Sequence, residues 1–145
     1  MKLRTILAAA GAAVALGTTG ALVLPAVASA HSATHTLKFI SVQKATASFG
    51  TAVQGIQGTD KNTAGKTVGF DMLYLKFTSA GTATANVTVD TNGGFLYGTF
   101  NVTKTGQITN GKVTGGTGAF AGATGTITVK AISSTKHAVT ITYSG

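Results

Sequence analysis

Residues 111–128 read Gly111-Lys-Val-Thr-Gly-Gly-Thr-Gly-Ala-Phe-Ala-Gly-Ala-Thr-Gly-Thr-Ile-Thr128. Six glycines stand between short runs that contain β-branched residues. β-branched residues favour strands, and glycine adopts the positive φ angles that tight connections need. The stretch therefore predicts two strands joined by a tight, glycine-rich connection.

The chain after Ala30 shows the same composition, with almost no helix signal and many Thr, Val, Ile, Gly and Phe residues. A polar loop is expected over residues 58–65, and Thr91-Asn92-Gly93-Gly94 is a strong hairpin signal. The predicted strands cover residues 36–43, 46–57, 66–78, 82–90, 95–103, 107–114, 124–133 and 136–144. Many short strands without helices form either a sandwich or a closed barrel, and periodicity alone does not choose between the two.

The strand over residues 68–77 differs from the others because both of its faces are apolar. Most predicted strands alternate apolar and polar residues, as residues 83–90 do, which indicates one buried and one solvated face. In residues 68–77, one face carries Phe70, Met72 and Tyr74, and the other carries Leu73 and Leu75. We therefore expect this strand to be covered on both sides, by the core and by another layer or subunit.

Residues 1–30 have the pattern of a secretory signal peptide. Lys2 and Arg4 give a basic start, an apolar stretch follows, and Ala28-Ser29-Ala30 provides a small-residue cleavage site. The alternative is a retained membrane anchor, but Pro25 ends the apolar stretch and no basic cluster follows Ala30. We expect a secreted protein, extracellular or associated with the cell envelope, with no stable membrane anchor after cleavage. Residues 31–145 would form a single domain.

Composition excludes several classes of function. Without residues 1–30 the chain keeps nine lysines against three aspartates, a net charge of +6, and contains no arginine, glutamate or cysteine. The lysines are isolated, so no basic stripe is present for nucleic acid, and no nucleic-acid partner is expected. The absence of cysteine rules out thiol nucleophiles, thiolate metal sites and disulfides.

Three segments in order carry a family resemblance. They are Gly65-Lys-Thr-Val-Gly-Phe-Asp71, Gly93-Gly-Phe-Leu-Tyr-Gly-Thr-Phe100 and Val113-Thr-Gly-Gly-Thr-Gly-Ala-Phe-Ala-Gly-Ala-Thr-Gly125. Together they resemble the bacterial branch of the dirigent-like and allene oxide cyclase-like barrel proteins. The resemblance covers roughly residues 38–143, and its most specific part is Gly-Gly-Thr-Gly-x-Phe.

This resemblance implies an all-β, eight-stranded antiparallel β-barrel of calycin type, with a mostly apolar central cavity and often a homotrimer. Members of this family guide cyclisations or the coupling of phenoxy radicals. The chain departs from the plant dirigent pattern at three places. Ser41-Val42-Gln43 stands where acidic residues are usual, and Phe70 and Thr124 each replace an arginine. No catalytic assignment carries over for those groups.

Asp71 is the predicted catalytic residue. Of the three aspartates, Asp60 falls in the expected polar loop and Asp90 precedes a turn, where aspartate favours local backbone hydrogen bonds. Asp71 lies within an apolar strand, so a cavity-facing carboxyl would have a raised pKa and could transfer a proton. The alternative is a structural carboxylate bonded to the backbone or to a lysine.

Tyr74 and Tyr97 are predicted ligand-binding residues through their hydroxyl groups. Packing in the core or an interface is the alternative, and Tyr74 cannot share a face with Asp71 unless a bulge intervenes. A copper site would need His31 at a new N-terminus with His35 or His137, but nothing else in the chain resembles such enzymes. We therefore expect neither a metal nor an organic cofactor.

The sequence thus favours a barrel that binds a small apolar or phenolic molecule in its cavity. It would act, if it is an enzyme, as a cofactor-independent isomerase or cyclase. The alternative is a non-catalytic extracellular or envelope module, which the missing arginines and acids favour.

Overall fold

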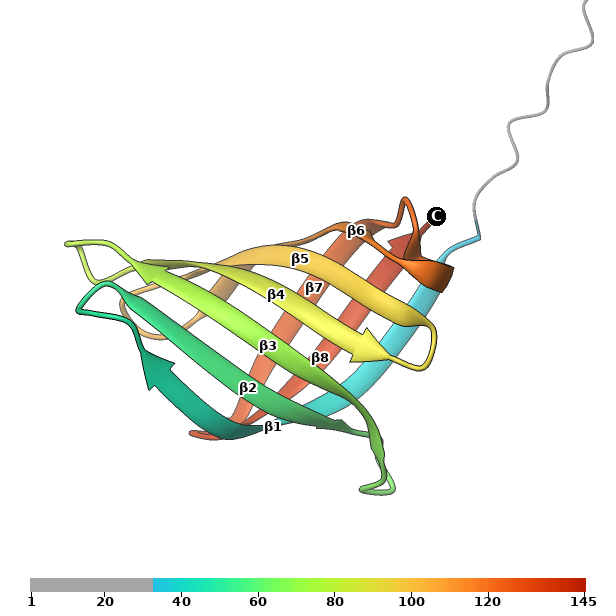
Figure 1. Cartoon of the computed structure of the whole chain (residues 1–145), viewed down its shortest axis with the longest axis horizontal. Helices are drawn as coiled ribbons and strands as arrows, with labels where there is room; N and C mark the ends of the chain where they lie inside the picture. Colours follow the sequence, from blue (N-terminus) through green and yellow to red (C-terminus); the bar gives the residue numbers. More distant parts are fainter. Residues whose placement is uncertain (1–32) are drawn as a thin grey trace, which may run out of the picture. The chain divides into compact units, whose positions relative to one another are not determined.

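The computed structural model describes residues 33–145, which form a closed β-barrel of eight antiparallel strands in sequence order (Figure 1). The prediction of an all-β, eight-stranded antiparallel barrel is confirmed. The strands are β1 (His35–Ser48), β2 (Val53–Lys61), β3 (Thr67–Phe77), β4 (Ala83–Thr91), β5 (Gly94–Val102), β6 (Ile108–Gly116), β7 (Thr124–Ser133) and β8 (Lys136–Ser144). One short 3₁₀ helix, η1 (Gly118–Phe120), lies between β6 and β7. The predicted signal peptide, residues 1–30, lies outside the described residues.

The barrel closes because β1 pairs with both β2 and β8. Phe39 lies opposite Val139, and Ser41 lies opposite His137 on β8 and opposite Asp60 on β2. Closure gives every strand a paired neighbour on both sides. The described part of the chain has no helix long and apolar enough to span a membrane.

The interior is apolar because the alternate residues of each strand point inward. The fully buried side chains include Leu96, Ile141 and Ala85, and they come from three different strands. The inward residues of β4 are the predicted ones, Ala83, Ala85, Val87 and Val89. They alternate with Thr84, Asn86 and Thr88, which are exposed or half-buried. This alternation is the pattern of a sheet with one buried and one solvated face.

The glycine-rich stretch closes one end of the barrel. Gly118 has a φ of 59° and begins η1, whose Ala119 N–H donates to the Gly93 carbonyl in the β4–β5 turn. Phe120 is 4 % exposed, and its ring packs edge-on against Tyr143 at 5.4 Å between centroids. The predicted strands on either side of this connection are confirmed as β6 and β7.

The first two predicted strands were wrong in their boundaries. The break between them lies at residues 49–52 and not at residues 44–45, because β1 continues to Ser48 through a β-bulge between Gln43 and Ala45. The polar loop predicted to begin at residue 58 is also wrong, since β2 continues to Lys61 and includes Asp60. The break in apolar alternation at these places marks a bulge and a buried polar cluster, not chain reversals.

Candidate functional site

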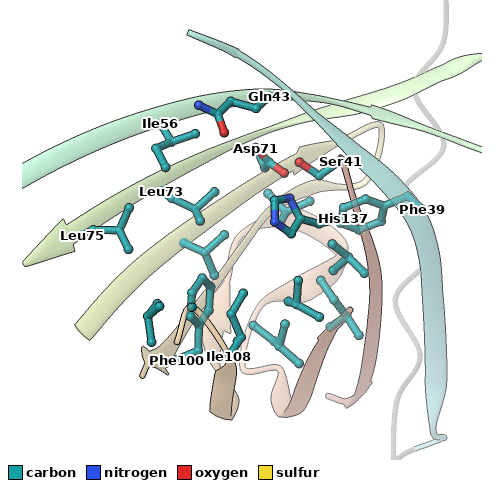
Figure 2. Close-up of a pocket in the computed structure, with 18 residues that line it drawn as sticks. Phe39, Ser41, Gln43, Ile56, Asp71, Leu73, Leu75, Phe100, Ile108 and His137 are labelled. Carbon is teal, nitrogen blue, oxygen red and sulfur yellow. The ribbon is translucent and has the colours of Figure 1, made fainter. Parts of the chain in front are cut away.

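A cavity of about 180 Å³ lies inside the barrel, and side chains from all eight strands line it (Figure 2). Most of the wall is aliphatic or aromatic, with Phe39, Leu73 and Phe100 among its members. Four polar side chains complete it: Ser41, Gln43, Asp71 and His137. The cavity therefore combines a large apolar surface with a small polar region, which is the usual character of a ligand pocket.

The polar region forms where β8, β1, β2 and β3 lie side by side. Ser41 on β1 is opposite His137 on β8, while Asp71 on β3 is opposite Gly58 on β2. Figure 2 shows Asp71, Ser41 and His137 grouped on one side of the cavity. Residues far apart in the sequence are thus brought together by barrel closure.

Two Gly-x-Asp segments position the two buried carboxyl groups. Gly58-Thr59-Asp60 on β2 pairs antiparallel with Gly69-Phe70-Asp71 on β3, so each aspartate lies opposite the glycine of the other segment. A Cβ atom at Gly58 would overlap Asp71 Oδ1 and would lie 2.7 Å from Ser41 Oγ. Glycine at residue 58 therefore provides the space in which these two polar groups stand.

Both carboxyl groups are buried and incompletely hydrogen-bonded. Asp60 is 1 % exposed and Asp71 is 5 % exposed. Within residues 33–145, no donor of another residue serves either Asp60 oxygen or Asp71 Oδ1, so the partner left to each carboxyl is the other one, through a shared proton. Burying charged groups is costly, so two adjacent buried carboxyls make this region a candidate site.

Asp60 has a strongly perturbed pKa. Burial is the main cause, and the negative charge of Asp71 and a side-chain hydrogen bond to Asp71 add to it, so the pKa of Asp60 rises from 3.8 to about 8. Asp60 is therefore mostly protonated at neutral pH. Asp60 is not among the residues that line the cavity, and its carboxyl lies beside Gly69 on β3.

An outer pocket of about 520 Å³ adjoins the cavity near the start of β6. It is lined by the loop before β6 and by parts of β6 and β7, and it shares Gly106, Ile108, Val129 and His137 with the inner cavity. In the described chain, β6 and β7 pair in register at just two positions, Lys112 with Thr126 and Val113 with Gly125. The outer pocket lies beyond those pairs, so the cavity reaches the surface where the sheet is least complete.

The structure places the predicted residues on different sides of the barrel wall. Asp71 lines the cavity, as expected if its face is inward. Tyr74 and Tyr97 are 48 % and 38 % exposed on the outer face, so their hydroxyl groups are not part of the cavity wall. The expected opposition of Asp71 and Tyr74 is thus observed, while the roles predicted for all three residues stay predictions.

Ser41, Asp60 and His137 were missed as site residues. Asp60 was wrongly placed in a loop, and His137 was considered just for copper. Among residues 33–145, no group of three or more His, Asp or similar side chains could hold a metal ion, and His31 lies outside that range. The period-two pattern of the strands could have identified Ser41 and His137. Ser41 shares one face of β1 with Phe39 and Gln43, and His137 shares one face of β8 with Val139 and Ile141.

Comparison with known proteins supports the fold alone. No family model matches the chain, and no curated protein matches its sequence. Among solved structures, the chain is similar to pyocyanin demethylase, with a TM-score of 0.60 and 17 % sequence identity. The match covers 76 % of this chain and 100 % of that one. At this identity the likeness extends to the barrel architecture, and the resemblance to dirigent-like and allene oxide cyclase-like proteins stays a prediction beyond it.

Proposed function

We propose that this chain is a secreted barrel that binds a small, largely apolar or phenolic molecule in its cavity. The observation that carries the proposal is an apolar cavity of about 180 Å³ with the Asp71 carboxyl in its wall. An engineered apolar cavity of about 150 Å³ holds benzene, so a single-ring molecule is a suitable size. The secretion part rests on the pattern of residues 1–30.

Asp71 would give the bound molecule its chemistry. An apolar wall restricts a flexible guest to one conformer, and a carboxylate at hydrogen-bonding distance can take or return a proton. Such an arrangement suits a cyclisation or a stereoselective coupling without a cofactor. Pyocyanin demethylase, by its name, acts on a small molecule, which supports the use of this architecture for small-molecule chemistry.

Filling the cavity will abolish binding. Leu73 lines the cavity, whereas Met72, its neighbour on β3, is 62 % exposed on the outer face. We expect Leu73→Trp to reduce the affinity for toluene and phenol by about tenfold or more, because the indole ring occupies the space that the guest needs. Met72→Trp makes a similar change in size on the outside and should leave the affinity unchanged. Ligand-detected NMR on the chain beginning at His31 measures both.

Equal binding to the wild-type protein and to Leu73→Trp would place these molecules outside the cavity. Failure of toluene and phenol to bind the wild-type protein would contradict the proposal itself. Circular dichroism of each variant confirms that the barrel is intact before titration.

A second part of the proposal concerns the outer face, which we propose is the interface of a homotrimer. Five large apolar side chains of β3 and β5 are between 38 % and 62 % exposed on either side of β4: Phe70, Met72, Tyr74, Phe95 and Tyr97. The two apolar rows flank the polar outward residues Thr88 and Asp90 of β4. Large exposed apolar surface rimmed by polar residues marks interaction sites. The predicted second apolar face of this strand is thus present and uncovered by the rest of the described chain.

Light scattering at micromolar concentration should give three times the monomer mass. Met72→Lys should shift the protein to monomer, because an ammonium group would be buried without a partner in the interface. Thr126→Lys, on the exposed outer side of β7, should leave the assembly intact. A monomeric wild-type protein would rule out the trimer.

A further inference from the structure

Asp71 presents a carboxyl group in the wall of the cavity. Its side chain is 5 % exposed and lines the cavity, while its Oδ1 is buried over Gly58 on β2. Figure 2 shows the Asp71 carboxyl beside Ser41, with His137 close by. A buried carboxylate is stable when a hydrogen-bonded counter-charge accompanies it, so the site lacks a partner that a guest can provide.

The protein does not supply that counter-charge from its own cavity wall. No lysine or arginine is among the lining residues, although nine lysines lie on the chain after residue 30. The groups around Asp71 are the carboxyl of Asp60 on β2, Ser41 and Gln43 on β1, the aliphatic Val89 on β4, and the imidazole of His137 on β8. Within residues 33–145, the Oδ1 atom of Asp71 receives no hydrogen bond from the His137 imidazole.

The two carboxyl groups differ in role because they differ in position. Asp71 lines the cavity, whereas Asp60 does not and lies beside Gly69. The raised pKa of Asp60 keeps it mostly protonated at neutral pH. The acidic group available to a guest is therefore the carboxyl of Asp71.

We propose that the guest is a small aromatic molecule with a protonated amine, and that the amine binds the Asp71 carboxylate. The inference rests on the proposed ligand-binding function and names the class of molecule within it. The ring would occupy the apolar part of the cavity, between Phe39, Leu73 and Phe100. A cation beside a desolvated carboxylate forms a charge-assisted hydrogen bond, which is stronger than a neutral one.

Three probes with the same ring test the class. Benzylamine carries a positive charge at neutral pH, benzyl alcohol is neutral with a hydroxyl donor, and benzoate is negative. We expect benzylamine to bind the wild-type protein about tenfold or more tightly than benzyl alcohol, because hydrogen bonds to charged groups are the stronger ones. Benzoate should bind most weakly, since its charge repels Asp71. Titration calorimetry at pH 7 in low salt measures all three.

A pair of variants separates the charge from the shape of the site. Asp71→Asn removes the charge that faces the cavity and should make benzylamine and benzyl alcohol bind with similar affinity. Asp90→Asn makes the same change on the exposed outer face of β4 and should keep the preference for benzylamine. The wild-type probe series is decisive without either variant, so a folding defect in one of them leaves the proposal testable.

The outcomes are distinguishable. Equal binding of benzylamine and benzyl alcohol to the wild-type protein, or tighter binding of benzoate, overturns the amine class while the ligand-binding function stands. An amine preference that persists in Asp71→Asn overturns the assignment to Asp71. If none of the probes binds and toluene and phenol also fail, the ligand-binding function and this inference fall together.

Discussion

Replacing Asp60 with asparagine should remove most of the pH dependence of the stability of the barrel between about pH 4 and pH 8. The pKa of Asp60 is raised from 3.8 to about 8, chiefly by burial and further by the charge of Asp71. Below pH 3.8 the carboxyl is protonated in both the folded and unfolded states, so its contribution to stability is complete. Between pH 3.8 and about pH 8 the carboxyl is deprotonated in the unfolded state but still protonated in the folded state. The free energy of unfolding therefore falls as the pH rises.

The expected slope in the wild-type protein is about 1.4 kcal/mol per pH unit within that window, before other groups are counted. Asp60→Asn has no proton to lose there, so it should be more stable than the wild-type protein at pH 8. Urea unfolding at pH 4, 6 and 8 measures the difference. Asp90→Asn, which changes an exposed carboxyl on β4, is the matched control and should keep the wild-type slope. A wild-type slope that survives Asp60→Asn would contradict the assignment of the pH dependence to this residue.

Gly58→Ala should destabilise the protein by about 1–3 kcal/mol, since overpacking a filled interior has a cost of this size. The added methyl group would overlap Asp71 Oδ1 and lie 2.7 Å from Ser41 Oγ, so both side chains must move. The same change should weaken the binding of benzylamine, because it displaces the carboxylate that receives the amine. Thermal unfolding and titration calorimetry check the two effects.

Gly55→Ala is the control on the same strand. Its Cβ would meet Phe49 Cε2 at 3.3 Å, and Phe49 is 61 % exposed and free to turn away. We expect a change in stability within about 0.5 kcal/mol, as for most surface substitutions. If both variants lost similar stability, the cost would come from alanine in β2 in general. The carboxyl pair would then not depend on glycine at residue 58.

The architecture could be predicted because local sequence signals and the final structure agree over most of the chain. The strands predicted over residues 124–133 and 136–144 match β7 and β8, and the Asn92-Gly93 turn connects β4 and β5 as expected. In these segments most inward residues are apolar, with His137 as the exception, and most outward residues are Thr, Lys or Asn. Period-two alternation is then sufficient to locate a strand and its buried face.

The prediction was wrong where polar groups are buried. Asp60 follows a glycine in a stretch of Gly, Gln, Thr and Asp residues, and these are the signals of a loop when residues are taken one at a time. In the barrel, the same glycine is needed for the close approach of Asp71, and the aspartate points inward beside it. A repeated Gly-x-Asp at residues 58–60 and 69–71 was the available clue, but its meaning depends on the β2–β3 register, which the sequence does not display.

The candidate site was predicted in part for the same reason. Asp71 stood out because its strand is apolar, and the structure places it in the cavity wall. Ser41 and His137 did not stand out, because each is an isolated polar residue in the sequence. They come together only when β1 pairs with β8, which are the first and last strands of the domain. Closure of the barrel is a long-range event, and single-strand patterns contain no information about it.

The end of the barrel beneath Phe120 and η1 has a consequence for what the cavity can accept. Phe120 is buried at that end and the outer pocket lies at the other, so a guest of the proposed kind would enter and leave past the outer pocket. Such a chamber would not suit a polymer that has to pass through it. A long substituent would extend past His137 into water. The depth of the cavity would then limit how much of a guest is buried, and the ring would be the part that enters first.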